Sequence, residues 1–236
     1  MKSVEIRNLT ELSYTMREAM NQLKANIEFS GDDVKIILIT SCNPNEGKST
    51  VAFELACSMA RDGKKVCYMD ADIRKSVFNI RYKVVSDGKI IGLAHLLTCE
   101  VSEIVHTTNV QGLDVVLAGQ NVPDPTMLFK NKRFDILLDA LRNHYDYVII
   151  DTAPLGAVID AAILAPKCDG TLLIIEDNST SGRQAQKVVK QLELANANIL
   201  GVVLNKTSIE HKKYYYYYSE SGEKKRRKSS KSSKQL

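Results

Sequence analysis

The sequence lacks several features that mark common structural classes. It has no tryptophan, and no apolar run approaches the roughly 18 residues of a membrane-spanning helix. Its first residues, MKSVEIRNLTELSY, are polar and charged, so we expect no secretory signal. The five cysteines are widely spaced and include no CxxC pair, which favours reduced thiols in the cytoplasm over a disulfide framework.

The histidines and the distribution of charge further limit the kinds of site and segment that the chain can contain. The four histidines have no metal-ligand spacing, so we expect no zinc site. From Lys212 onward, nine Lys or Arg and two Glu give a net charge of +7, which leaves −3 for residues 1–211 of a chain whose total is +4. A segment so rich in Lys, Arg and Ser cannot bury enough apolar surface to order itself. We therefore predict a disordered, tyrosine-rich basic tail over residues 210–236.

The preceding residues alternate between apolar, β-branched runs and helical stretches. This alternation predicts an α/β fold, in which a mainly parallel sheet is flanked by helices. The expected strands are 34–40, 65–70, 113–119, 146–154, 170–176 and 198–205. The expected helices are 12–28, 48–63, 90–98, 126–143, 158–164 and 181–196. Sheets of this kind bind ligands beyond the carboxyl ends of their strands, so the residues there are candidates for a site.

The strongest motif is CNPNEGKST, residues 42–50, between an expected strand and an expected helix. It matches the phosphate-binding loop (P-loop) pattern G-x-x-x-x-G-K-[ST], except that Cys42 fills the first Gly position. Gly47 lets the backbone approach a phosphate, Lys48 reaches the β- and γ-phosphates, and Ser49 offers a hydroxyl to Mg²⁺. A Gly-Lys-Ser turn that merely opens a helix is the alternative, and the strand before the motif argues against it. The expected nucleotide-binding residues of the loop are Asn45, Glu46, Gly47, Lys48, Ser49 and Thr50.

Carboxylates end two other expected strands. Asp70 and Asp72 follow the strand of VCYMDADIR, and Asp151 ends VIIDTAP, which resembles a Walker B motif. A single strand-ending Asp often only caps the next helix. Three acids at the sheet edge that carries the P-loop favour a metal site instead, with Ser49, Asp72 and Asp151 as expected ligands.

The residues at the end of the last expected strand, LNKTS, indicate which nucleotide base the protein binds. Proteins that bind guanine through a P-loop read it with N-K-x-D, and Ser208 stands where that Asp is needed. Adenine is therefore expected, and ATP is the expected nucleotide. Asn205 is a candidate adenine contact, although an Asn that simply begins a turn remains an alternative.

Cys42 suggests a separate hypothesis. A thiol near a helix N-terminus and near Lys48 is expected to have a lowered pKa and to react with oxidants. The simpler interpretation, a small residue that fills a tight turn, is favoured over a reactive thiol.

Taken together, ITSCNPNEGKST, YMDADIRKS, VIIDTAP and the C-terminal tyrosine cluster resemble the bacterial protein-tyrosine kinases that control capsular and exopolysaccharide synthesis. The resemblance covers nearly the whole chain and includes GLAHLLTCE (92–100) and AGQNVPDPTMLF (118–129). It implies a P-loop NTPase fold similar to that of cell-division and plasmid-partition ATPases, with ATP and Mg²⁺ as cofactors. It also implies a cytoplasmic protein that is recruited to the inner face of the cell membrane.

The resemblance assigns roles to individual residues. Lys48 and Ser49 bind phosphates and Mg²⁺, while Asp72 and Asp151 support the metal and its waters. Asp70 accepts the proton of the attacking tyrosine hydroxyl, and Arg74 orients the second motif. The implied phosphoacceptors are Tyr214, Tyr215, Tyr216, Tyr217 and Tyr218.

The resemblance also implies partners. These are a membrane adaptor whose cytosolic tail activates the kinase, a cognate tyrosine phosphatase, and further copies of the chain. In the family an E-x-x-R-x-x-R helix builds a ring, and here the matching residues are Glu18, Asn21 and Lys24, so both arginines are absent. The absence of both arginines argues against the family's ring contacts. The units that we expect are an N-terminal helical segment (1–30), which forms contacts between copies in the family, a kinase domain (31–209) and the tail.

Two other classes of function remain as alternatives. A positioning or partition ATPase that acts as a dimeric switch usually has an extra Lys early in the loop, where this chain has Asn43, and lacks a terminal tyrosine run. A nucleic-acid-binding module would present aromatic rings among its basic residues, whereas here the charges follow the aromatics separately, so we expect no specific nucleic-acid partner. The basic run 224–228 is expected to make weak contact with anionic membranes.

Overall fold

The computed structural model of the chain describes residues 2–98, 101 and 103–207. The five clustered tyrosines and the basic run therefore lie outside the described residues. Residues Met1–Asn205 form one compact unit. No helix among the described residues is long and apolar enough to cross a membrane.

The centre of the unit is a nine-stranded sheet in the order β4-β1-β5-β6-β3-β7-β2-β8-β9. All neighbouring strands are parallel except the pairs β1–β4 and β5–β6, which are antiparallel. The strands are β1 (Lys2–Ile6), β2 (Ile36–Ser41), β3 (Val66–Asp70), β4 (Val84–Ser86), β5 (Val105–Thr107), β6 (Leu113–Val116), β7 (Tyr147–Asp151), β8 (Gly170–Glu176) and β9 (Ile199–Asn205).

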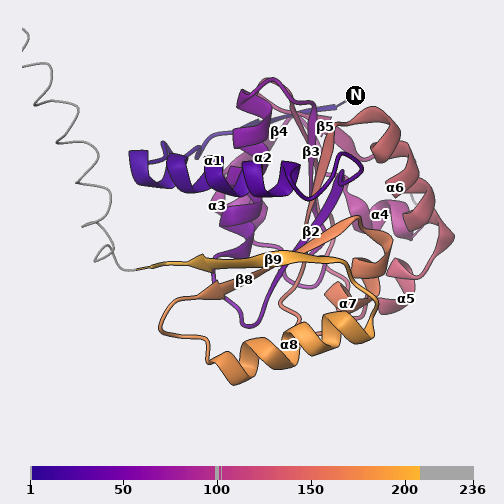
Figure 1. The fold of residues 1–236 in the computed structure, drawn as a ribbon. Coiled ribbons are helices and arrows are strands. Elements are labelled where there is room, and N and C mark those ends of the chain that lie inside the picture. The colour runs from indigo at the N-terminus through magenta and orange to yellow at the C-terminus, as the bar shows by residue number, and fades with distance from the viewer. Residues whose placement is uncertain (1, 99–100, 102, 208–236) are drawn as a thin grey trace, which may run out of the picture. The chain divides into compact units, whose positions relative to one another are not determined.

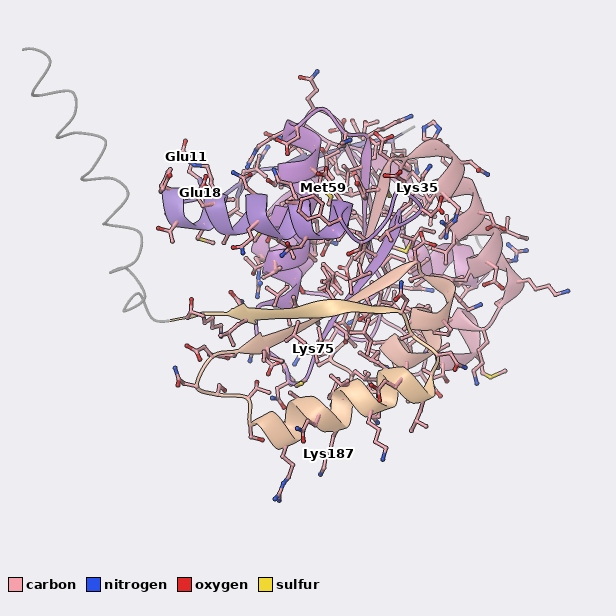
Figure 2. All side chains as sticks on the ribbon, viewed as in Figure 1. Glu11, Glu18, Lys35, Met59, Lys75 and Lys187 are labelled. Carbon is pink, nitrogen blue, oxygen red and sulfur yellow. The ribbon has the colours of Figure 1, made fainter. Side chains whose placement is uncertain are left out.

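Helices cover both faces of the sheet (Figure 1). One face packs against α1 (Tyr14–Glu28), α2 (Lys48–Arg61) and α3 (Phe78–Arg81). The other packs against α4 (Leu93–Leu97), α5 (Thr126–Phe129), α6 (Lys132–His144), α7 (Asp160–Leu164), the 3-10 turn η1 (Ala165–Lys167) and α8 (Gly182–Leu194). Figure 2 shows Met59 of α2 inside the molecule and Lys187 of α8 on its outer surface.

The expected α/β architecture is confirmed, and each of the six expected strands is present. The central strand β2, with the sequence IILITS, is buried along its whole length, as its continuous apolar run predicts. Helix α2 ends where expected: Gly63 follows its C-cap with a φ of +84°, a conformation that glycine adopts without strain.

Several short elements were not predicted from the sequence. Only a helix was expected for residues 1–30, but this segment also contains β1, which joins the sheet through β4 and β5. Strands β4 and β5 have three residues each, too few to show a period in the sequence. The helix expected over 126–143 is two helices, because Asn131 begins a new one by accepting a hydrogen bond from the Arg133 amide.

The topology gathers the predicted motifs at one edge of the sheet. Strands β3, β7, β2, β8 and β9 are adjacent and parallel, so their carboxyl ends meet there. Asp70 and Asp151 end neighbouring strands as direct register partners. The P-loop leaves β2 at the same edge, which brings the loop and the carboxylates together.

Candidate active site

The P-loop has an unusual backbone that its sequence explains. Asn45 and Gly47 have positive φ angles of 68° and 89°. A Cβ atom on residue 47 would lie 2.2 Å from Asn205 Nδ2, which donates a hydrogen bond of 2.8 Å to Glu46 O. The positive φ favours glycine here, and a Cβ atom would displace the Asn205 side chain from the loop. Asn205 braces the loop through this bond, and its adenine contact stays a prediction.

A polar network that the sequence analysis did not foresee supports the start of the loop. Glu46 is almost fully buried, and its carboxylate accepts hydrogen bonds from the Asn43 amide (2.8 Å) and side chain (3.0 Å) and from the Thr180 hydroxyl. Gln184 of α8 donates to Asn43 Oδ1 at 2.7 Å. The Glu46 side chain therefore holds the loop in place, which leaves main-chain amides for the expected anion.

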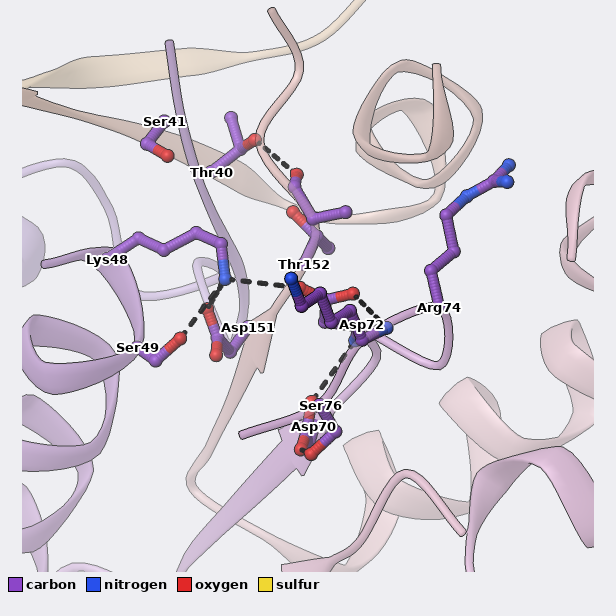
Figure 3. A network of polar contacts seen from close by, with 12 residues as sticks. Thr40, Ser41, Lys48, Ser49, Asp70, Asp72, Arg74, Ser76, Asp151 and Thr152 are labelled. Atoms are coloured by element: carbon purple, nitrogen blue, oxygen red, sulfur yellow. Dashed lines mark hydrogen bonds and ion pairs between the residues drawn. The ribbon is translucent and has the colours of Figure 1, made fainter. Parts of the chain in front are cut away.

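Lys48 lies at the centre of the site (Figure 3). Its Nζ atom is 3.1 Å from Ser49 Oγ, 3.3 Å from Asp151 Oδ1 and 3.7 Å from Asp72 Oδ2. Burial disfavours the charged ammonium group, but the carboxylates, chiefly Asp151, more than offset it and raise the pKa of Lys48. The lysine is therefore a fully charged group that is already aimed at the carboxylates.

Asp151 is held from its other side by Tyr68. The Tyr68 hydroxyl donates a hydrogen bond of 3.1 Å to Asp151 Oδ2, and both side chains are buried. Burial and the nearby Asp151 charge raise the pKa of Tyr68 well above its ordinary value, so it stays a donor. Tyr68 was not predicted as a site residue, because a tyrosine inside an apolar strand is typical of core packing.

Asp70 is buried directly behind Asp72. Its Oδ1 accepts a hydrogen bond from the Asp72 amide (3.1 Å), and its Oδ2 accepts one from the Ser76 hydroxyl (2.5 Å). Burial and the neighbouring Asp151 charge raise the pKa of Asp70 to about 7. A carboxylate with this pKa exchanges a proton near neutral pH, which suits a general base.

Arg74 points away from Lys48 (Figure 3). It forms a fork with the buried Asp160 of α7, through Nε at 2.6 Å and Nη2 at 2.8 Å, and its Nη1 donates to Pro123 O at 2.5 Å. These bonds fix the second motif against α7 and the segment 118–129. Arg74 therefore holds the second motif in position rather than contacting Lys48.

The residues expected to hold a metal ion fit a hard cation. Ser49, Asp72 and Asp151 supply hydroxyl and carboxylate oxygens around Lys48, the donor type that Mg²⁺ and similar ions prefer. Among the described residues no group of three or more His, Cys, Asp or Glu could hold a metal ion. A divalent ion in this site must therefore take further ligands from phosphates and water, as is usual for P-loop proteins.

For Cys42 the structure supports a small residue in a tight turn, which the sequence already favoured, over an activated thiol. Its side chain is buried, and a Cβ atom on Gly156 would lie 2.0 Å from Cys42 O, so the loop packs tightly here. Burial, together with the Glu46 charge, raises the pKa of Cys42 to about 11. Desolvation thus raises the pKa that the sequence suggested Lys48 would lower, and Cys42 fills a tight turn.

The three residues that match the ring-forming pattern lie on α1. Asn21 donates a hydrogen bond of 3.3 Å to Glu18 on the same helix. Lys24 is buried and forms an ion pair with Asp62, the C-cap residue of α2. Lys24 therefore holds α1 against its own chain.

Comparisons with known proteins find related sequences and related folds. Residues 34–210 match the family model of the AAA domain. The chain is 43% identical to tyrosine-protein kinase CpsD of Streptococcus pneumoniae over 199 residues, which cover 84% of this chain and 87% of the relative. The kinase domain of Escherichia coli tyrosine kinase ETK superposes with a TM-score of 0.74 at 28% identity, over 81% of this chain and 77% of that one.

A cell-division ATPase shares the fold. The septum site-determining protein MinD of Pyrococcus horikoshii, solved with Mg-ADP, superposes with a TM-score of 0.59 at 22% identity, over 72% of this chain and 69% of that one. P-loop proteins of this fold bind nucleotides together with a divalent metal ion. The kinases share more of the sequence, because CpsD is 43% identical over 84% of this chain. The chain belongs to the bacterial tyrosine-protein kinases of the capsular and exopolysaccharide type.

Proposed function

We propose that the protein uses ATP and Mg²⁺ to phosphorylate the tyrosines of its own C-terminus, Tyr214 to Tyr218, and thereby regulates the synthesis and export of a capsular or extracellular polysaccharide. The observation that carries the proposal is the meeting of Lys48, Asp70, Asp72 and Asp151 at one sheet edge. The last strand before the tyrosines ends at this edge, where Asn205 bonds to the P-loop.

The chemistry assigned to each residue follows from its surroundings. Phosphoryl transfer depends on positioning and on neutralising charge. Lys48 and the loop amides supply positive charge to the phosphates, and Mg²⁺, held by Ser49, Asp72 and Asp151, would add to it. Asp70 accepts the proton of the tyrosine hydroxyl, whose ordinary pKa near 10 keeps it neutral before the reaction.

The length of the connection allows the tail to reach a site. Tyr214 lies nine residues beyond Asn205, so an extended chain spans at most about 30 Å. This reach covers the chain's own site and that of an adjacent copy. The family resemblance favours transfer between copies, so self-association belongs to the proposal.

The same resemblance supplies the expected cellular setting. A membrane adaptor with a cytosolic tail would recruit the kinase to the inner face of the cell membrane and activate it. A cognate phosphatase would reverse the modification. The 43% identity to a kinase named CpsD supports a capsule-related pathway of this kind.

The alternative is a positioning ATPase that switches between dimeric states, and the fold shared with MinD favours it. The loop argues against it. Such ATPases usually have a lysine at the position of Asn43, and here Asn43 is held within its own chain by Glu46 and Gln184.

Covalent labelling separates the two functions. The purified protein is incubated with Mg²⁺ and ATP labelled at the γ-phosphate, and label that stays on the denatured protein is counted. A kinase retains the label, and the Lys48→Met variant and a variant with all five tail tyrosines changed to Phe do not. Release of labelled phosphate with none bound to the wild-type protein would support the ATPase switch and contradict the kinase proposal.

A further inference from the structure

Arg81 is a basic residue beside the P-loop that the sequence analysis did not single out. It is the last residue of α3, and its Nη1 atom donates a hydrogen bond of 2.6 Å to Thr50 Oγ1. Its carbonyl accepts a hydrogen bond of 2.8 Å from Asn8 Nδ2, which fixes the main chain. Because Thr50 directly follows Ser49, the guanidinium group lies at the N-terminal turn of α2.

Aromatic packing sets the position of α3 independently of this hydrogen bond. The ring centroid of Phe53, one turn beyond Thr50 on α2, is 5.0 Å from that of Phe78 and 4.3 Å from that of Tyr82. Phe78 and Tyr82 flank Arg81 in sequence, so their contacts with Phe53 hold α3 beside α2. The bond from Arg81 to Thr50 is therefore not needed to dock the helix.

The charge of Arg81 has no carboxylate partner among the described residues. Arg74 and Arg142, in contrast, form forks with Asp160 and Asp169. A guanidinium group has five N–H donors, and within the described part of the chain one of those of Arg81 meets an acceptor. A cation at a helix N-terminus also opposes the positive end of the helix dipole. An anion at this position would satisfy both the free donors and the charge.

We infer that Arg81 is a further nucleotide ligand, which binds oxygens of the α-phosphate. Lys48 extends to Asp151 and Asp72, where the transferred phosphate must react, whereas Arg81 reaches Thr50, one residue further along α2. Arginine suits this task because its planar fork of donors matches phosphate oxygens. The inference rests on the nucleotide site of the proposed function and adds a residue to it.

Binding measured without phosphoryl transfer tests the inference. Affinities for ADP, AMP and adenosine are measured by calorimetry on the wild-type protein, Arg81→Ala and Arg81→Lys. Arg133→Ala serves as the control, because Arg133 is an exposed arginine at the start of α6, on the other face of the sheet. Thermal unfolding of each variant checks that the fold is kept.

We expect Arg81→Ala to bind ADP and AMP about tenfold more weakly, the effect of losing one charge-assisted contact, and to bind adenosine as before. Arg81→Lys should recover part of the loss, and Arg133→Ala should match the wild type. Equal ADP affinity in Arg81→Ala and Arg133→Ala would overturn the inference, as would an equal loss for adenosine. A wild-type protein that binds none of the three ligands would instead contradict the proposed function.

Discussion

Lys48 and Asp151 form a buried ion pair, with Nζ 3.3 Å from Oδ1, between the P-loop and the end of β7. Lys48, the proposed phosphate ligand, is therefore also part of the buried structure. Removing one partner of such a pair leaves the other charge without compensation in a place from which water is excluded.

Lys48→Met should therefore abolish transfer of phosphate to tyrosine and also lower the free energy of unfolding, by about 3 kcal/mol. The double variant Lys48→Met with Asp151→Asn should recover much of that stability while remaining inactive. Urea denaturation and phosphotyrosine detection measure the two effects. Wild-type phosphotyrosine levels in Lys48→Met would show that the P-loop assignment is wrong.

Asp70→Asn should slow phosphoryl transfer with little change in ATP affinity and should stabilise the protein at alkaline pH. Burial raises the pKa of Asp70 from 3.8 to about 7, so the folded state favours the protonated carboxyl, and stability is lost as pH rises through 7. The stability advantage of the Asn variant should grow by about 2 to 3 kcal/mol between pH 5 and pH 8. Urea denaturation at the two pH values measures it, and a constant difference would contradict the burial argument.

Cys42 should resist alkylation in the folded protein. A thiol with a pKa of about 11 has about one hundredth of the thiolate that the ordinary pKa of 9.0 would give at pH 8. Peroxide or iodoacetamide should therefore inactivate the wild type and Cys42→Ser equally slowly, with or without nucleotide. Peptide mapping after labelling measures the modification. Faster inactivation of the wild type, prevented by nucleotide, would restore the idea of a redox-sensitive loop.

Phosphorylation of the tail should weaken its attraction to anionic membranes. Five phosphates would add roughly −8 to −10 in charge at neutral pH and would reverse the +7 of the residues from Lys212 onward. Binding to vesicles that contain phosphatidylserine should fall as the phosphotyrosine count rises and as salt is added. If the fully phosphorylated protein and the variant with five Tyr→Phe changes bind such vesicles equally, the charge switch does not exist.

The sequence predicted the elements that carry a clear period or a motif. The buried strands β2, β3 and β7 are recognisable in the sequence by their continuous apolar runs. The P-loop is recognisable by the order Gly-Lys-Ser. Because parallel strands end at one edge, the meeting of Lys48 with Asp72 and Asp151 followed from the topology.

Contacts between segments that are far apart along the chain could not be predicted from the sequence. The bonds from Tyr68 to Asp151 and from Arg81 to Thr50 join segments whose spacing carries no pattern. The pKa of Cys42 depends on how completely the fold removes water, and the sequence shows only its charged neighbours.

Peptide mass spectrometry can detect directly whether the protein modifies its own C-terminal tyrosines. The purified wild-type protein is incubated with ATP and Mg²⁺, digested and mapped beside Lys48→Met. We predict phosphotyrosine on the peptide that contains Tyr214 to Tyr218 in the wild type and none in the variant. An unmodified tail peptide after incubation, under conditions in which the wild-type protein binds ATP, would show that these tyrosines are not its substrates.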